Sequence, residues 1–236
     1  MIFKVLNVIS PQSIFAGDDD GKKTKSNPAP SVIAQYVFDE RDFNSLAVYV
    51  STARFPFGFT VWGFTELNGA QEDSANRFDL TRAFSEYRFS HAGLGNLLNI
   101  SGLIAQIEYT DIGPQAGELL RFGIAYRHKL NIPSAGGLGG LTGWLQWRVH
   151  PVETDRDGGQ ASLIYFIPLH KNAHINGWLD INYSKEGSPK WVFGPFLNLK
   201  ITDRSWFVLR YRFNGFEEAS PDLDGTGFAI GIRVDF

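Results

Sequence analysis

Apolar and polar residues alternate along most of the chain with a period of two, in segments of about nine to twelve residues. The pattern is clearest in the last segment, whose apolar positions are Phe228, Ile230, Ile232, Val234 and Phe236. Successive side chains of a β-strand point to opposite faces, so this alternation predicts strands with one apolar and one polar face. Turn-forming residues separate the segments, and helical spacing is hard to find. We therefore expect an all-β protein.

Twelve segments have this pattern, and each is predicted to be one strand. Their approximate bounds are 31–38, 44–53, 58–67, 80–90, 99–110, 118–128, 141–150, 159–168, 174–184, 190–201, 205–214 and 225–236. Strands of sandwiches average about five or six residues, whereas a tilted strand that crosses a bilayer needs about 9–11. An even number of strands can close without edges, as hydrocarbon requires. We predict a single antiparallel transmembrane up-and-down β-barrel of about twelve strands. Ten strands is the alternative, because 31–38 and 58–67 are the least regular segments.

The composition supports this fold and excludes several other classes. The chain of 236 residues is 43% hydrophobic and has 20 phenylalanines, six tryptophans and no cysteine. Disorder, disulfide scaffolds, thiolate zinc sites and cysteine nucleophiles are thereby excluded. No apolar stretch approaches the ~18 residues of a spanning helix. The formal charge of −3 gives no support for a nucleic-acid partner. So many bulky apolar side chains would overfill a barrel interior, so we expect them to face lipid.

The N-terminal part of the chain differs from the rest. Residues 1–16 place one lysine before a short apolar stretch that ends in Ala16, and we interpret them as a possible signal peptide, with a disordered N-terminus as the alternative. Residues 17–30 are polar and contain two prolines, which predicts a disordered leader. The barrel is expected to occupy residues 31–236.

The last ten residues, Gly227–Phe236, alternate strictly and end in phenylalanine. This ending resembles the terminal strand of Gram-negative outer-membrane β-barrels. The resemblance implies an outer-membrane location, contact with lipid and lipopolysaccharide, and recognition of this strand by the barrel assembly machinery. A twelve-stranded chain of this length is also similar to the nucleoside-specific channel-forming family and to the oligogalacturonate-type anion porins. No motif decides between these two families.

Acidic residues are distributed unevenly over the predicted connections. Seventeen of the 25 fall in or beside odd-numbered connections, Asp39, Glu66 and Glu153 among them, and only Asp203 falls in an even one. This sorting supports the strand order and predicts acidic extracellular loops. These loops are 67–79, 151–158 and 215–224. They can bind divalent cations near lipopolysaccharide, but solvated charge is the simpler interpretation.

The polar faces of the strands carry mostly arginine. Alternation places these charged residues in the lumen: Arg82, Arg88, Arg121, Arg127, Arg148, Lys200, Arg210, Arg212, Arg233, Glu86, Glu108, Asp180 and Asp235. Nine cations and four acids leave a net +5. Guanidinium groups in a narrow passage concentrate anions and bind carboxylate or phosphate with two hydrogen bonds. We predict an outer-membrane diffusion channel with a basic, Arg-lined lumen for small anionic or polar solutes. The alternative is a salt-bridge network that plugs the lumen.

Two groups of aromatic residues have predicted positions. Residues near strand ends, expected at the membrane interface, are Tyr109, Tyr126, Tyr183, Tyr211 and Phe236. A second group can line the lumen and stack against sugar or base rings: Trp62, Trp144, Trp178, Phe84, Phe166 and Phe196. Packing around an interior plug is an equal alternative for this group, and the alternation around Trp62 is ambiguous.

An enzyme and an adhesive barrel are the alternatives to a channel. Barrel enzymes that act on lipid need a Ser or Asp activated by His near the rim. His150 has acidic residues close in sequence, but we interpret it as a solvated rim histidine. His170 and His174 have metal-ligand spacing but lie partly in a turn. We therefore expect no enzyme activity, no metal and no cofactor. A non-conducting structural or adhesive barrel with acidic loops stays as the other alternative.

Overall fold

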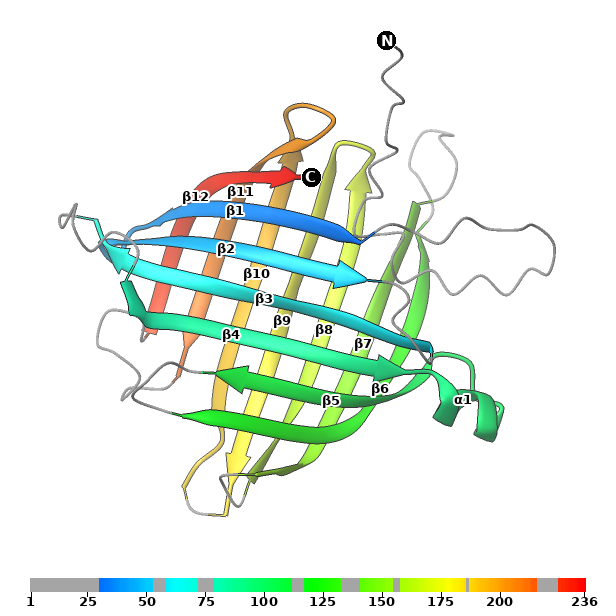
Figure 1. The fold of residues 1–236 in the computed structure, drawn as a ribbon. Helices are drawn as coiled ribbons and strands as arrows, with labels where there is room; N and C mark the ends of the chain where they lie inside the picture. Colours follow the sequence, from blue (N-terminus) through cyan, green and yellow to red (C-terminus); the bar gives the residue numbers. More distant parts are fainter. Residues whose placement is uncertain are drawn as a thin grey trace, which may run out of the picture.

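The strands form one closed barrel, in which each strand pairs antiparallel with its neighbours in sequence and β1 pairs with β12 (Figure 1). The computed structural model describes residues 30–52, 58–71, 79–111, 117–132, 141–154, 158–185, 187–215 and 225–236. The strands are β1 (Ser31–Asp39), β2 (Phe43–Thr52), β3 (Phe59–Ala70), β4 (Asp79–His91), β5 (Leu103–Asp111), β6 (Glu118–Ile132), β7 (Leu141–Glu153), β8 (Gly158–His170), β9 (Ala173–Ser184), β10 (Lys190–Lys200), β11 (Ser205–Asn214) and β12 (Gly225–Asp235). The prediction of twelve antiparallel strands is confirmed, and the ten-strand alternative is wrong.

Several predictions fall outside the described residues. The possible signal peptide, residues 1–16, lies outside them, as does the leader up to residue 29. Most of the predicted acidic loops also lie outside. Their first residues belong to strands, because β3 continues to Ala70 and β7 to Glu153.

One predicted strand begins later than expected because a short helix precedes it. The helix, α1 (Gly93–Leu98), connects β4 to β5, which starts at Leu103 rather than at residue 99. Asn99 ends the helix in the left-handed conformation, with a φ of 55°, which asparagine tolerates better than most residues. The Ile100 amide then donates to the Gly95 carbonyl at 2.8 Å, which turns the chain toward β5.

The barrel is apolar outside and polar inside. On β12 the outward Phe228, Ile230 and Ile232 are 59%, 52% and 45% exposed, whereas the inward Arg233 and Asp235 are buried. A soluble barrel of this size has the opposite arrangement, with its apolar face in the core. In the part of the chain that the structure describes, no helix has the length and hydropathy to span a membrane.

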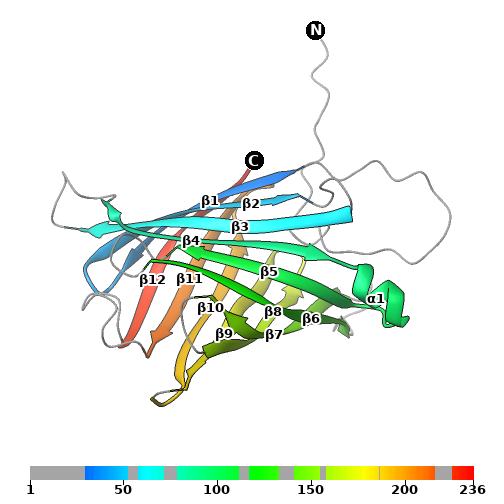
Figure 2. The same ribbon diagram turned by 60° about the horizontal axis from the view of Figure 1, so that its bottom comes forward.

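Both chain termini of the barrel lie at one end, which we call the terminal end. Ile33 of β1 pairs with Asp235 of β12 there. Because the strands alternate in direction, the even-numbered connections lie at the same end, including α1 and the turns at 171–172 and 201–204. Figures 1 and 2 show α1 beyond the barrel wall at the ends of β4 and β5. We call the opposite end the loop end.

An irregularity between β6 and β7 shapes the interior. The register shifts between Phe122 and Ile124, so that β7 has one extra residue at this point. Gly123 lies at the shift, where a Cβ atom would overlap the carbonyl oxygen of Val149 and crowd the ring of His150. The close approach therefore requires glycine, and it brings β7 tightly against β6 beside the charged interior.

Candidate functional site: the charged interior of the barrel

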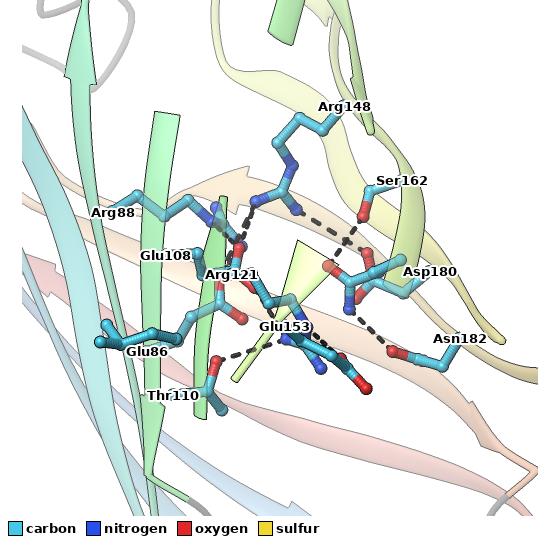
Figure 3. A network of polar contacts seen from close by, with 12 residues as sticks. Glu86, Arg88, Glu108, Thr110, Arg121, Arg148, Glu153, Ser162, Asp180 and Asn182 are labelled. Atoms are coloured by element: carbon cyan, nitrogen blue, oxygen red, sulfur yellow. Dashed lines mark hydrogen bonds and ion pairs between the residues drawn. The ribbon is translucent and has the colours of Figure 1, made fainter. Parts of the chain in front are cut away.

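A network of ion pairs links the inward faces of β4 to β9, and Figure 3 shows it from close by. Its centre is Glu108 on β5, which is 0% exposed. Three guanidinium groups contact its carboxylate: the distances from Arg88 Nε, Arg121 Nη1 and Arg148 Nη1 to a Glu108 oxygen are each 2.9 Å. Charge-assisted hydrogen bonds of this kind are the strong ones, so a single carboxylate holds together three neighbouring strands, β4, β6 and β7, around β5.

The network extends beyond Glu108 in both directions along the wall. Arg121 Nε lies 3.3 Å from a carboxylate oxygen of Glu153. Arg148 Nη2 lies 3.7 Å from Asp180 on β9, which means that it reaches past β8. Arg88 also pairs with Glu86 on its own strand. We call these residues of β4, β5, β6, β7 and β9 the large ion cluster. It is composed of Glu86, Arg88, Glu108, Arg121, Arg148, Glu153 and Asp180.

A second ion pair crosses the barrel interior. Arg210 Nη1 on β11 lies 2.8 Å from Glu66 Oε1 on β3, and both residues are 4% exposed. Arg212 lies 4.0 Å from the same carboxylate, which also accepts a hydrogen bond from the Ser45 hydroxyl. Strands β3 and β11 are four steps apart around the wall, or about 19 Å at ~4.8 Å per step. The side chains therefore meet across the lumen, and we call Glu66–Arg210 the cross-barrel pair.

These clusters correct the predicted placement of three acids. Asp39, Glu66 and Glu153 were expected in or beside the outer connections, but their side chains are 2%, 5% and 6% exposed and are paired with Arg41, Arg210 and Arg121, respectively. The reason is that three strands are longer than predicted: β3 continues to Ala70, β7 to Glu153, and β1 to Asp39, whose side chain turns inward.

The inward arginines outnumber the inward carboxylates by one among the described side chains. The arginines are Arg41, Arg88, Arg121, Arg127, Arg148, Arg210, Arg212 and Arg233. The seven carboxylates are Asp39, Glu66, Glu86, Glu108, Glu153, Asp180 and Asp235. Eight arginines and Lys200 against seven carboxylates leave +2 from these described groups. The predicted +5 also counted Arg82, whose side chain lies outside the described residues, and did not count Arg41, Asp39, Glu66 or Glu153. Lysines on inward positions lie toward the strand ends, as Lys200 does.

His150 does not lie where the sequence predicted. It was expected to be a solvated rim histidine, but it is 0% exposed and lies beside the large ion cluster, with neither ring nitrogen in a hydrogen bond. The extra residue of β7 places it below the rim. Among the described residues, His170 and His174 belong to no group of three or more side chains suited to a metal ion.

The predicted lumen aromatics lie on inward strand positions, and the register settles the ambiguity of Trp62. It pairs with Ser51 on one side and Arg88 on the other, both inward residues, and the Arg88 guanidinium lies 4.4 Å from its ring centroid. Arg127 lies 4.4 Å above the Trp144 ring in the same way, which is the geometry of a cation–π contact. Trp144 stacks on Phe166, with centroids 6.3 Å apart.

The other three predicted lumen aromatics, Trp178, Phe196 and Phe84, also lie on inward positions. Trp178 and Phe196 are in contact at 5.4 Å, and Arg210 lies 5.2 Å from the Phe196 ring. Phe84 pairs with Glu66 in register and contacts Phe64 at 5.6 Å. In the interior, therefore, arginine side chains lie against aromatic rings: Arg88 against Trp62, Arg127 against Trp144 and Arg210 against Phe196.

Trp206 is an interior residue that the sequence reasoning missed. Its indole N–H donates to Asp235 at 3.1 Å, and its ring contacts that of His174 at 4.8 Å. Arg233 Nε also donates to Asp235, at 2.7 Å. Trp206 alternates in phase with the inward Arg210, so the same parity rule would have found it.

Three further predicted lumen residues have different surroundings. Arg127 donates from Nε to the side-chain oxygen of Gln146 at 2.9 Å. Lys200 ends β10 and donates to Asp203 at 2.9 Å, and this hydrogen bond together with the lysine charge lowers the pKa of the Asp203 carboxyl below its ordinary value. Arg82 belongs to β4, but its side chain lies outside the described residues.

The predicted interface aromatics occupy outward positions. Tyr126, Tyr183 and Phe236 are 41%, 39% and 63% exposed, and Tyr109 and Tyr211 are half-buried. Tyr126 lies near the middle of β6 rather than at its end, because that strand continues to Ile132. Tyr211 belongs to an outward aromatic group toward the loop end that the sequence reasoning did not identify. Its rings are those of Phe193, Tyr211, Phe213 and Phe228.

Comparison of the sequence with known protein families and with curated proteins finds no match. The structure is similar to that of the NanC porin, with a TM-score of 0.52 over 87% of this chain and 99% of the porin, at 9% sequence identity. It also aligns with the KdgM porin, with a TM-score of 0.48 over the same shares at 15% identity. The translocator domain of the autotransporter NalP from Neisseria meningitidis aligns with a TM-score of 0.42 over 90% of each chain, at 12% identity. At such identities the similarity to NanC is one of fold alone.

Proposed function

We propose that the chain is a diffusion channel for small solutes in the outer membrane of a Gram-negative bacterium. The observation that carries this proposal is the division of the barrel wall into an apolar outer face and a charged inner face. Trp147, Val149 and Ile124 are 54%, 45% and 46% exposed outside, while Arg148 beside them is 1% exposed inside. A bilayer stabilises such an exterior, and a closed sheet leaves no unpaired strand edge in hydrocarbon.

This location assigns partners to the two surfaces. The outward face would contact outer-membrane lipid and, in the outer leaflet, lipopolysaccharide. The terminal strand β12, with its outward Phe228, Ile230 and Ile232, would be the segment that the barrel assembly machinery recognises. The inward face would contact the solute.

The preferred solutes would be small anions or neutral molecules rich in hydrogen-bond acceptors. The inward acids offset most of the charge of the inward arginines, so selectivity has to come mainly from local donors rather than from net charge. Arg148 and Arg210 each have a buried Nε–H group without an acceptor, and Arg212 has two N–H groups in this state. An unpaired buried donor costs about 1–3 kcal/mol, so a carboxylate or phosphate that accepts from it would be stabilised.

The cross-barrel pair makes the passage narrow. Because Arg210 and Glu66 are in direct contact from β11 to β3, a solute has to pass beside this bridge or displace it. An anion can replace the Glu66 carboxylate on the two arginines, which a cation cannot do. We therefore expect anions to pass more easily than cations, because an anion can take the place of Glu66 on Arg210 and Arg212 while it passes.

The same contacts support a second candidate, a non-conducting structural barrel. Glu108, Arg148 and His150 are 0%, 1% and 0% exposed, so water does not reach the centre of the large ion cluster. Salt bridges in that state hold the strands together and close the lumen. A lipid-modifying enzyme has no comparable support, because His150 is buried and neither of its ring nitrogens is hydrogen-bonded to a Ser or an acid among the described residues.

Reversal potentials across planar bilayers test these functions. In a potassium chloride gradient, the purified barrel is expected to conduct with an anion-selective reversal potential. Replacing both members of the cross-barrel pair, in Glu66→Gln/Arg210→Met, should raise the single-channel conductance. The matched control is Asp203→Asn, which removes an exposed pair in a turn and should leave conductance unchanged. Cation selectivity would contradict the proposed solute class. Absence of conductance in both the wild-type barrel and the Glu66→Gln/Arg210→Met variant would favour the structural barrel.

A further inference from the structure

The connection between β4 and β5 exposes an unusual group of apolar side chains at the terminal end. Leu97, Leu98 and Ile100 are 81%, 53% and 45% exposed, and Leu97 is the most exposed large hydrophobic residue in the part of the chain that the structure describes. Single exposed leucines are common on protein surfaces, but a contiguous group marks a contact with another apolar phase.

This connection also lacks charge, unlike the other terminal-end turns that are described in full. Residues 92–102 contain no Asp, Glu, Lys or Arg. The β8–β9 turn contains Lys171, and the β10–β11 turn contains Asp203 and Arg204. Turns that enter water at the end of a barrel gain nothing from an apolar surface, so the difference indicates that α1 is in a different environment.

Helix α1 is fixed to the rim of the barrel by close backbone contacts. A Cβ atom at Gly95 would overlap the carbonyl oxygen of Leu103, and Gly102 adopts a φ of 85° while its carbonyl accepts from the Arg127 amide at 2.9 Å. Leu97 follows Gly95 by two residues, which is about 200° around a helix. Its side chain therefore points away from the end of β5 that Gly95 contacts.

The exposed group continues the apolar outer face of the barrel. Directly adjacent in the chain are β4 and β5, whose outward Phe89 and Ile107 are each 39% exposed. The rings of Phe59 and His91, on neighbouring outward positions just before α1, are 4.9 Å apart. The outward residues of β4 and β5 nearest α1 are Phe89, His91, Leu103, Ala105 and Ile107, and none is Asp, Glu, Lys or Arg. Figures 1 and 2 show α1 at the ends of these two strands.

We propose that α1 is a membrane-contact element, which inserts Leu97, Leu98 and Ile100 into the boundary between headgroups and acyl chains of the phospholipid leaflet at the terminal end. Such apolar faces bind in the plane of the interface, and the absence of charge in the segment removes the main cost of insertion. This inference rests on the proposed bilayer location of the barrel. It adds that one connection at the terminal end sits in lipid while its neighbours sit in water.

Site-directed spin labelling tests this placement, and the absence of cysteine allows single labels without background. Leu97→Cys and Leu98→Cys report on α1, Arg204→Cys reports on a water-exposed turn at the same end, and Ile230→Cys reports on the middle of the outer face. Each labelled barrel is reconstituted in phospholipid vesicles. Collision rates are then measured with oxygen, which concentrates in lipid, and with a neutral nickel chelate, which stays in water.

The ratio of oxygen to nickel collisions at positions 97 and 98 is expected to be severalfold higher than at position 204 and to approach that at position 230. If positions 97 and 204 give the same ratio while position 230 reports lipid, α1 lies in water and the inference fails although the barrel spans the bilayer. Shielding of positions 97 and 98 from both reagents would show that protein covers them, which also overturns it. A water-like ratio at position 230 would overturn the bilayer location itself, and the inference with it.

Discussion

Removing the carboxylate of the cross-barrel pair should destabilise the barrel strongly. The Glu66→Gln substitution preserves the size and one acceptor oxygen of the side chain, so it does not create a cavity. It leaves Arg210 and Arg212 close together, with no opposite charge from Glu66. Both arginines are largely buried, with side chains 4% and 16% exposed, so water can compensate only in part.

The size of the effect follows from the geometry. Two unit charges 2.8 Å apart attract by about 6 kcal/mol at an effective dielectric constant of ~20. Desolvation offsets most of this attraction in the intact pair, but breaking a buried pair leaves one charge uncompensated and typically costs about 3–5 kcal/mol. We expect a loss in this range for Glu66→Gln. Arg210→Met should cost less, because Arg212 still lies 4.0 Å from Glu66.

A double-mutant cycle separates the pair from its surroundings. Urea unfolding of the wild-type barrel, both single variants and Glu66→Gln/Arg210→Met in lipid vesicles gives four free energies of unfolding. The double variant should lose less free energy of unfolding than the two single variants lose together, and the difference, the coupling energy, should be about 0.5–3 kcal/mol. Heat-dependent gel mobility checks that each variant is folded before unfolding begins. Additive losses, within about 0.3–0.5 kcal/mol, would refute a contact between β3 and β11 across the lumen.

Two further substitutions test the outer wall and the register shift. Ile230→Arg places a charge on the middle of the outer face and should lower stability in lipid vesicles by about 2–4 kcal/mol, whereas the control Ile201→Arg, in an exposed turn, should change it by less than about 0.5 kcal/mol. Equal effects of the two arginines would contradict a lipid-facing wall. Gly123→Ala forces a Cβ atom into the Val149 carbonyl and should cost about 1–3 kcal/mol, measured as a lower midpoint in the heat-dependent mobility shift. An unchanged midpoint would show that β6 and β7 are not in close contact there.

The strand count and the two faces of the wall followed from local pattern. Successive side chains of a strand point to opposite faces, so the neighbours of Ile230 in sequence show that it shares a face with Phe228 and Ile232. The same rule placed Arg148 and Glu108 on inward positions without knowledge of their partners. It failed where the local pattern is broken: at residues 99–102, which follow α1 and precede β5, and at His150, where β7 has an extra residue. Around Trp62, where both faces carry aromatic residues, it left the face undecided.

The pairing of the interior charges was decided by tertiary structure. Glu66 and Arg210 are 144 residues apart, and nothing in the sequence near either residue indicates the other. Their contact depends on closure of the sheet between β1 and β12, which brings the walls that carry β3 and β11 face to face. The extra residue in β7, which buries His150 and aligns Glu153 with Arg121, likewise appears only in the register. Alternation determined that each strand has one polar and one apolar face, and the bulk of the apolar side chains indicated that the apolar face is the outer one. Whether the inward arginines are free to meet a solute or are held by carboxylates depends on distances between strands far apart in sequence, because electrostatic pairing is set by proximity in space.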